Sequence, residues 1–409
     1  MKKYLLKLLQ MSSGVRRFIA SESLLGIGFG IFMLVFNLHL LDLGFDEAEI
    51  GRITSVGTII MGIFSIPSGL LANKYGRKKV LVSGIILIGI GYAGIGIGVR
   101  SLIIYISQII MSLGVTLLIT SEIQLLFYYS RSNREETQAY SMLFAIFTLF
   151  TGIGTILGGY LPSWLGGKTT IYQGALFISS GIILSVALIR GILLPQEKDS
   201  DVNTSHILSF EKFTKQIKNR NLWLFSTFTL LIGVSYAFVI PFLNIIVKFR
   251  YGWNDEPVSI VLTINGLFLF IGSILLPYIL EKIGLEKTYF FVFLSNVLMS
   301  IVLYLSMPIY LFIPLLLLRG GSFTMLNNIV ESQTMQSIEE DERNLFAGMR
   351  AVLRSLGSAV AMYLAGIILS DKNYYLPFLL SGAFILIGYI YFLVFIKPII
   401  VLKLYSQND

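Results

Sequence analysis

Long apolar stretches separated by short polar segments dominate the chain. A transmembrane α-helix needs about 20 predominantly apolar residues to cross a hydrocarbon core of ~30 Å. The stretches are continuous and do not alternate residue by residue, which argues against a membrane β-barrel. Twelve of them are long enough, at approximately 18–41, 50–72, 80–99, 101–128, 138–161, 171–194, 222–247, 258–280, 288–307, 309–332, 344–370 and 374–397. The pattern therefore predicts an all-α integral membrane protein with twelve transmembrane helices.

The composition supports a membrane protein and narrows the possible chemistry. Of the 409 residues, 55% are hydrophobic and only 13% are charged, whereas a soluble domain carries roughly 25% charged residues. Too little polar surface remains for a cytosolic enzyme or a nucleic-acid-binding module. The chain has no cysteine and only two histidines, which argues against thiolate catalysis, thiolate-bound zinc and a catalytic metal centre. We therefore expect no enzyme activity, no metal and no cofactor.

The distribution of Lys and Arg predicts the orientation of the chain. With the N-terminus placed in the cytoplasm, the inner segments carry 22 of the 31 Lys and Arg residues and the outer loops carry six. Cytoplasmic loops are enriched in these residues, so both termini are predicted to be cytoplasmic. The net charge of +8 then reports contact with anionic inner-leaflet lipid and not a nucleic-acid partner.

A long polar stretch near the middle divides the spans into two sets of six. We expect five regions, namely an amphipathic cytoplasmic N-terminus at 1–17, an N-terminal six-helix bundle at 18–194, a cytoplasmic linker at 195–220, a C-terminal six-helix bundle at 221–397 and a cytoplasmic tail at 398–409. Residues 1–10 are predicted to form a short basic helix on the membrane surface.

The two halves show a weak internal repeat. The segment 44–57 aligns without a gap to 252–265, at an offset of 208 residues. At the same offset Gly76 falls on Gly284, and Glu122 falls on Glu331 at an offset of 209. Parallel six-helix repeats about an axis normal to the membrane are typical of one large class of transporters. The sequence thus predicts two pseudo-symmetric six-helix bundles.

The loop after the second span carries the most specific motif. Its residues, Gly-Leu-Leu-Ala-Asn-Lys-Tyr-Gly-Arg-Lys-Lys at 69–79, resemble the signature of the major facilitator superfamily between the second and third helices. Asn73 stands where the family usually has aspartate. Gly69 is expected to allow close helix packing, Gly76 to form a tight turn and Arg77 to reach a carboxylate or a helix C-terminus. Because an amide carries no charge, any ion-pair relay here needs another acid.

The resemblance implies a twelve-helix transporter whose halves close against each other on the cytoplasmic side. The residues expected to shape this cytoplasmic gate are Gly69, Asn73, Gly76, Arg77, Arg134, Glu281 and Arg343, together with Glu122 and Glu331. The glycine-rich fifth span is similar to that of exporters in the superfamily. Two features of its drug/proton antiporters are absent, namely the Gly-Pro pair of the fifth helix and an arginine in the fourth.

Three glutamates within the spans are candidates for proton coupling, because ionisable groups at membrane depth are costly and usually functional. Glu122 and Glu331 could carry protons, or could form ion pairs with Arg77, Arg134 or Arg343. Glu22 could carry a proton or pair locally with Arg16 and Arg17. The sequence leaves these alternatives open.

Three arginines also fall within spans. Arg319 lies about 15 Å into the tenth span at 1.5 Å per residue, and Arg354 is expected at a similar depth, one turn from Arg350. Either they form tertiary pairs, such as Arg350 with Glu331 or Glu22, or they contact an anionic substrate. On the second reading, Arg319→Ala would abolish transport and leave the amount of folded protein unchanged.

These observations predict a secondary active transporter working by alternating access. The expected activity is proton-coupled efflux of a small amphipathic compound, and the alternatives are an importer of a small organic anion and a lipid or lipid-linked flippase. The expected partners are a small-molecule substrate, membrane lipid and protons, with no nucleic acid. We expect a monomer in the plasma membrane, namely the inner membrane of a bacterium.

Overall fold

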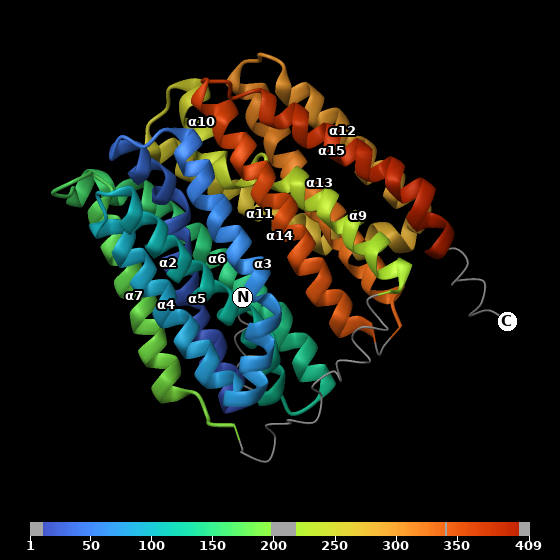
Figure 1. The fold of residues 1–409 in the computed structure, drawn as a ribbon, viewed down its shortest axis with the longest axis horizontal. Coiled ribbons are helices and arrows are strands. Elements are labelled where there is room, and N and C mark those ends of the chain that lie inside the picture. The colour runs from blue at the N-terminus through green and yellow to red at the C-terminus, as the bar shows by residue number, and fades with distance from the viewer. Residues whose placement is uncertain (1–10, 198–217, 340–341, 401–409) are drawn as a thin grey trace. The chain divides into compact units, whose positions relative to one another are not determined.

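The structure is a computed structural model that describes residues 11–197, 218–339 and 342–400. Within these residues, twelve helical segments are long and apolar enough to cross a membrane, which confirms the predicted number of spans. The predicted surface helix at 1–10, most of the central linker and residues 401–409 of the tail lie outside the described residues. The helices are drawn in Figure 1 and comprise α2 (Ser13–Asp42), α3 (Glu47–Tyr75), α4 (Arg77–Ile97), α5 (Ser101–Tyr129), α6 (Asn133–Leu165), α7 (Gln173–Leu193), α9 (Arg220–Ala237), α10 (Leu243–Tyr251), α11 (Asp255–Ile283), α12 (Leu285–Tyr304), α13 (Ile309–Gln336), α14 (Arg343–Ser370) and α15 (Leu376–Tyr391).

The seventh span is built from two helices. A short 3-10 turn at Ile240–Phe242 separates α9 from α10. Pro241 lies inside this turn, and a proline cannot donate the backbone hydrogen bond that a continuous α-helix would require. The interruption therefore lies within the apolar segment Arg220–Tyr251, which counts as one candidate span.

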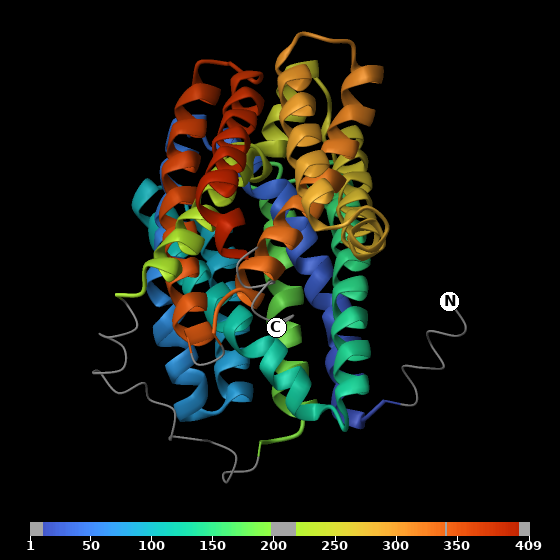
Figure 2. The ribbon, with the colours of Figure 1, turned by 90° about the vertical axis from the view of Figure 1, so that its right-hand side faces the viewer.

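The chain packs into two compact units that differ from a simple division into halves. Unit 1 consists of Met1–Phe45, Ile63–His206 and Asn254–Thr263, and unit 2 consists of Asp46–Gly62, Ile207–Trp253 and Ile264–Asp409. The first part of α3 thus belongs to unit 2, and the first part of α11 belongs to unit 1. The sequence did not predict this exchange of segments. Within each unit most helix axes are roughly parallel to one another (Figure 2).

Helix boundaries follow the internal repeat. Both ends of α3, Glu47 and Tyr75, are displaced by 208 residues from the ends of α11, Asp255 and Ile283. The following turns also correspond, because Gly76 has a φ of 90° and Gly284 has a φ of 79°. Glycine adopts this left-handed region without steric cost. The positions that align in sequence therefore have the same local structure.

Glycines bring the helices of unit 1 into close contact. A Cβ atom on Gly30 of α2 would lie 2.1 Å from the carbonyl oxygen of Thr151 in α6, and one on Gly154 would lie 2.2 Å from that of Ile27. Neither distance is possible between real atoms, so only glycine fits. These glycines of the first and fifth spans therefore serve close helix packing.

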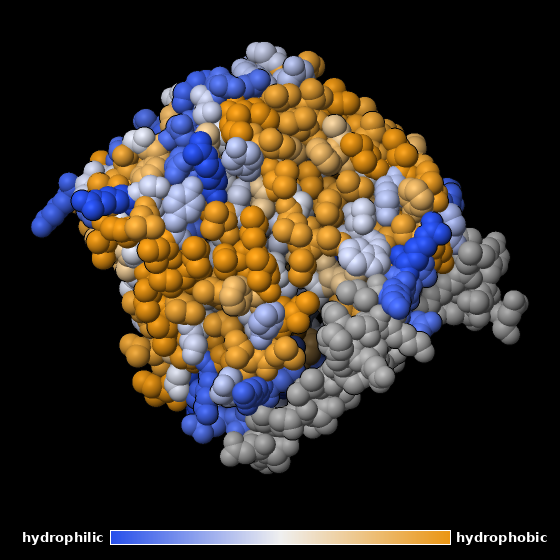
Figure 3. Space-filling model, viewed as in Figure 1, coloured by the Kyte–Doolittle hydropathy of each residue, from blue (hydrophilic) through white to orange (hydrophobic). Residues whose placement is uncertain are grey.

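The helices expose large apolar side chains on their outer flanks, where orange residues cover much of the face seen in Figure 3. The most exposed of them are 55% or more accessible and include Ile97, Leu102, Trp164, Leu188, Ile192 and Tyr310. Large apolar surfaces mark a contact with a membrane or another protein, and on helices long enough to cross a membrane this surface is expected to face lipid. The core of unit 2 is instead aromatic, with Phe228, Tyr289, Phe293 and Phe392 stacked on one another.

Candidate functional site

A buried ion cluster lies in unit 1 where α2, α5 and α7 meet. The guanidinium of Arg190 in α7 donates from Nη2 to Glu22 of α2. Its Nη1 donates to Glu122 of α5 at 3.4 Å, and its Nε donates to the hydroxyl of Ser21 at 2.9 Å. The ring of Phe18 lies 4.3 Å from the guanidinium carbon. One arginine therefore joins three helices through two carboxylates.

The cluster is almost completely shielded from solvent. The exposed fraction is 0% for the side chain of Arg190, 2% for Glu22 and 17% for Glu122. With both acids ionised, these three side chains carry one negative charge in excess. An excess charge is costly in a low-dielectric interior, and one bound proton would remove it. The slightly exposed Glu122 gives this set of groups its access to solvent.

Sequence analysis missed Arg190 and assigned the wrong partners to both acids. Glu122 pairs with Arg190 and not with Arg77, Arg134 or Arg343. Glu22 likewise pairs with Arg190 and not with Arg16 or Arg17. Arg190 was counted with the cytoplasmic charges because it stands close to the end of the sixth apolar stretch at 171–194.

A second ion pair joins α13 to α14 in unit 2. Arg354 donates from Nη1 to Glu331 at 2.7 Å and from Nη2 to the amide oxygen of Asn327 at 2.8 Å. The side chains of Arg354 and Glu331 are 26% and 38% exposed, so this site is open to small molecules. The predicted pair of Glu331 with Arg350 was wrong by one helical turn. Arg350 instead has its guanidinium carbon 6.0 Å from the ring of Phe346.

Arg319 occupies the interior of unit 2, where it is only 2% exposed. Its Nε donates to Ser300 at 2.8 Å and its Nη2 donates to Ser381 at 2.5 Å. The rings of Phe323 and Phe378 lie 5.8 and 5.7 Å from the guanidinium carbon. These contacts tie α13 to α12 and α15. This geometry favours a structural role for Arg319, and the substrate contact expected there stays a prediction.

An acid from outside the motif binds the signature loop, the name used here for residues 69–79. Glu197, at the start of the predicted linker, accepts a hydrogen bond from the backbone N–H of Lys78 at 2.9 Å. Its other oxygen lies 4.0 Å from Arg77. Gly76 begins α4 without a side-chain cap of its own, so Glu197 caps this helix from a distant part of the chain. Glu197 thereby supplies the carboxylate that Asn73 lacks.

The structure bears on three of the remaining gate residues. Gly69 has open space where a Cβ would lie, with no atom within 4 Å, and its expected role in close packing stays a prediction. The left-handed turn at Gly76 and the reach of Arg77 to a carboxylate are confirmed. Four further side chains are exposed and their role in a gate stays a prediction, namely Asn73, Arg134, Glu281 and Arg343.

Removal of the Glu197 carboxylate should destabilise the start of α4. We expect Glu197→Ala to lower the free energy of unfolding by about 0.5–2 kcal/mol, the usual cost of losing a helix cap. Thermal unfolding in detergent measures this change. The matched control is Glu281→Ala, which removes an exposed acid before the repeat-related turn. Equal stability of the two variants would show that Glu197 is not a cap.

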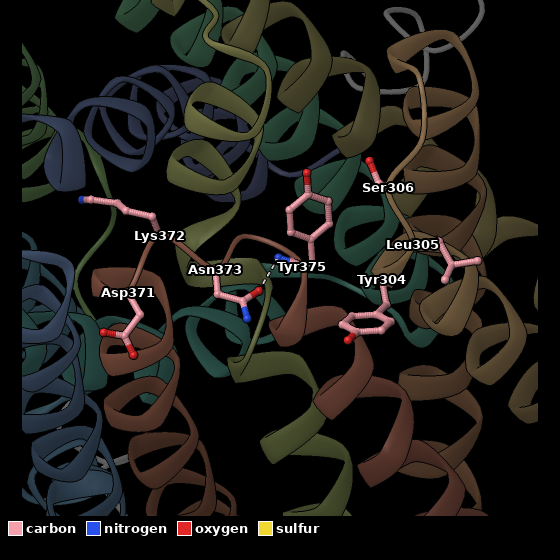
Figure 4. Close-up of a pocket in the computed structure, with 7 residues that line it drawn as sticks. All are labelled: Tyr304, Leu305, Ser306, Asp371, Lys372, Asn373 and Tyr375. Atoms are coloured by element: carbon pink, nitrogen blue, oxygen red, sulfur yellow. Dashed lines mark hydrogen bonds between the residues drawn. The ribbon is translucent and has the colours of Figure 1, made fainter.

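A cavity of about 470 Å³ lies in unit 2, between residues 304–306, which end α12, and the turn that follows α14. Tyr304 and Tyr375 are among the lining residues drawn in Figure 4, where the amide oxygen of Asn373 accepts a hydrogen bond from the backbone N–H of Tyr375 at 3.2 Å. Asp371 and Lys372 also border the cavity. None of the residues predicted to bind substrate lines it.

Comparison with known proteins places the chain in a family. The model of the Major Facilitator Superfamily matches residues 19–362. The chain belongs to this superfamily. Among curated relatives, the Quinolone resistance protein NorA of Staphylococcus aureus is 22% identical over 353 residues, covering 84% of this chain and 86% of the relative. The Multidrug resistance protein 2 of Bacillus subtilis is 20% identical over 381 residues, covering 88% and 90%.

Solved structures of other transporters share the fold. The nucleoside transporter NupG superposes with a TM-score of 0.74 at 14% identity, covering 93% of this chain and 98% of its own. A bacterial homolog to the human lysosomal transporter Spinster gives a TM-score of 0.77 at 10% identity, covering 93% and 95%. The superfamily member described here is therefore a multi-pass membrane transporter and not an enzyme.

Proposed function

We propose that this superfamily member exports a small amphipathic compound in exchange for protons. The observation that carries the proposal is the Arg190–Glu22–Glu122 cluster, in which two acids share one buried base. The names of the relatives, which describe resistance to quinolones and to multiple drugs, support export as the direction. The apolar helices and the superfamily membership support a location in a bacterial plasma membrane.

The proposed coupling step uses competition for one guanidinium. When Glu22 and Glu122 are both ionised, Arg190 neutralises only one of them, and a proton binds to the other. Movement of α2, α5 or α7 that separates Arg190 from a carboxylate leaves a buried unpaired charge, which is strongly unfavourable. Proton binding and helix movement are thereby linked, because each changes the free energy of the other. Substrate that favours one arrangement of these helices then shifts the affinity for the proton.

Substrate contacts are proposed at the exposed ion pair of unit 2. Arg354, Glu331 and Asn327 present a guanidinium, a carboxylate and an amide on neighbouring helices. Such a mixed polar site can hydrogen-bond to the polar end of an amphipathic compound of either charge. Arg350 lies one turn away and stays a candidate. An anion importer loses its main support, because Arg319 is enclosed by its own helices.

The proposal includes the orientation of the chain in the membrane and its oligomeric state. The excess of Lys and Arg in the alternate loops favours cytoplasmic termini, which places the signature loop and Glu197 on the cytoplasmic side. We propose that the monomer is the transporting unit, with a pathway that opens to each side of the membrane in turn.

Transport in cells tests the direction. Cells that express the protein should accumulate less of a fluorescent amphipathic dye than cells with an empty vector, and a protonophore should abolish the difference. Greater accumulation in expressing cells would support an importer and contradict the proposal. Movement of a labelled lipid between leaflets of proteoliposomes, without dye transport, would support a flippase and also contradict it.

A further inference from the structure

The cavity of unit 2 has two walls, each formed by a turn between helices. Residues 304–306 lie at the end of α12, and residues 371–375 connect α14 to α15. Its volume of about 470 Å³ falls within the range of roughly 300–1,000 Å³ that small-molecule sites occupy. The distribution of Lys and Arg predicts that both turns lie on the outer side of the membrane. The cavity is therefore placed to receive a ligand from outside.

The turn after α14 adopts a backbone conformation that its sequence does not favour. The N–H of Lys372 donates to the carbonyl oxygen of Leu369 at 2.8 Å, and the N–H of Asn373 donates to that of Ile368 at 3.3 Å. This pattern is the Schellman ending of a helix, whose left-handed position usually belongs to glycine. Lys372 occupies that position with a φ of 58°, and it is the only non-glycine residue with a positive φ among the described residues. A side chain is therefore kept in this wall at a steric cost.

The residue before Lys372 also departs from the usual helix ending. Asp371 is the C-cap of α14, where the partial negative charge of a helix C-terminus favours a cation and disfavours a carboxylate. Asp371 is exposed, and its carboxylate has no hydrogen-bond or ion-pair partner among the residues that the structure describes. Two adjacent residues of one cavity wall thus oppose local stability. Departures from local rules of this kind are typical of functional sites.

The other polar groups of this wall already have partners. The ammonium of Lys372 donates to the Glu47 carboxylate at 2.9 and 3.2 Å. Hydrogen bonding to Glu47 raises the pKa of Lys372, so this base stays charged and paired at any pH below the raised value. The amide oxygen of Asn373 accepts from the N–H of Tyr375 at the start of α15. Asp371 therefore contributes the charge that is available to a ligand.

A guanidinium next to the cavity fixes its two walls relative to each other. Arg250 of α10 donates from Nη1 to the carbonyl oxygen of Leu303 and from Nη2 to that of Leu305, both at 2.8 Å. Its guanidinium carbon also lies 4.2 Å from the ring centre of Tyr375. One side chain thus joins the end of α12 to the aromatic residue that precedes α15. The cavity is consequently preorganised, which lowers the entropic cost of binding.

The lining residues define the chemistry of the ligand. Tyr304 and Tyr375 contribute aromatic rings, and Ser306 contributes a hydroxyl. Aromatic faces stack on flat rings and attract cations, and a carboxylate binds an ammonium through a charge-assisted hydrogen bond. The ring of Tyr304 is accessible, because this residue is 37% exposed. A flat aromatic compound with a positive charge can use both rings and the Asp371 carboxylate at once.

We propose that this cavity is an outer binding site for a planar aromatic cation. The ring of the ligand lies against Tyr304 and Tyr375, and its cationic group hydrogen-bonds to Asp371. A bound ligand thereby links the end of α12 to the turn after α14. The site shares no residue with the Arg354–Glu331 pair at which substrate contacts are proposed. Binding here needs no proton gradient and no transport, so it does not rest on the proposed function.

Protection of a single cysteine tests the site, because the natural chain has no cysteine. Ser306→Cys places a thiol in the cavity wall, and its rate of reaction with a maleimide is measured in the purified protein. Proflavine, a planar tricyclic cation, should slow this reaction about fivefold at a concentration about four times its dissociation constant. Fluorescein, a planar tricyclic anion, should leave the rate nearly unchanged. Equal protection by the two compounds would overturn the proposal, because the site would not select positive charge.

A second cysteine shows whether the protection is local. Tyr310→Cys lies four residues beyond Ser306, at a position that is 71% exposed and does not line the cavity. Its thiol should react at the same rate with and without proflavine. Equal protection of Tyr310→Cys, or no protection of Ser306→Cys up to the solubility limit of proflavine, would contradict a site in this cavity.

Neutralising Asp371 tests the recognition of charge. Asp371→Asn keeps the size of the side chain, and in the Ser306→Cys background it should remove most of the protection by proflavine. The matched control is Asp42→Asn, which neutralises an exposed acid of unit 1 and should keep the protection. Full protection with Asp371→Asn, or equal loss in both variants, would overturn the proposal. If Asp371→Asn does not fold, Tyr304→Leu removes one ring of the site and should weaken the protection in its place.

Discussion

Arg190→Ala should nearly eliminate folded protein from the membrane. The substitution leaves Glu22 and Glu122 facing each other in a buried site without the guanidinium that joins them. Breaking a buried ion pair by removing one partner typically costs 3–5 kcal/mol, a large fraction of the stability of a folded domain. Fluorescence-detected size-exclusion chromatography of the detergent extract, compared with total protein on a gel, measures the folded fraction.

Removal of the two acids should rescue this variant. Arg190→Met combined with Glu22→Gln and Glu122→Gln has no ionisable group in the cluster, so no buried charge lacks a partner. We expect this triple variant to fold in near-normal amounts but to lose proton-coupled transport. Normal folding of Arg190→Ala alone would show that the cluster does not contribute to stability as its geometry indicates.

Arg319 should tolerate methionine but not alanine. Arg319→Ala leaves a cavity between α12, α13 and α15, and large-to-small changes in a core cost about 2–5 kcal/mol. Arg319→Met keeps most of the volume and removes the buried charge, a change that is often neutral or stabilising. Thermal unfolding in detergent should therefore show a clear loss for alanine and little change for methionine.

Transport by Arg319→Met separates the structural role from substrate binding. Because the guanidinium bonds to Ser300 and Ser381 inside unit 2, we expect the methionine variant to retain at least half of the parental dye transport. A folded methionine variant without transport would restore the substrate-binding role that the sequence suggested.

Helix number and the repeat were predictable because both depend on local sequence. The length of an apolar stretch directly determines whether a helix can cross the membrane, and all twelve spans are present. The glycine at the start of α4 was informative for a similar reason, because a left-handed turn depends on one residue. Close packing at Gly69 stays a prediction, since it depends on a neighbouring helix that the motif does not contain.

The ion pairs were not predictable because they depend on how helices rotate toward one another. Sequence spacing suggested that Glu122 and Glu331 pair with arginines that follow them, but Glu122 binds Arg190 from another helix. A signal for Arg190 did exist, since the apolar residues Ile192, Leu193 and Leu194 follow it. Depth alone does not decide the role of Arg319, because a mid-membrane arginine can face its own bundle.

Proton movement during transport tests the central claim most directly. Purified protein is reconstituted into liposomes that contain a pH-sensitive dye, and an amphipathic substrate is added in the presence of an imposed pH gradient. The parent should show a substrate-dependent dissipation of the gradient, whereas Glu22→Gln should exchange labelled substrate across the membrane without moving protons. Proton movement by Glu22→Gln at the parental rate, or substrate transport by the parent with no change in internal pH, would contradict the account.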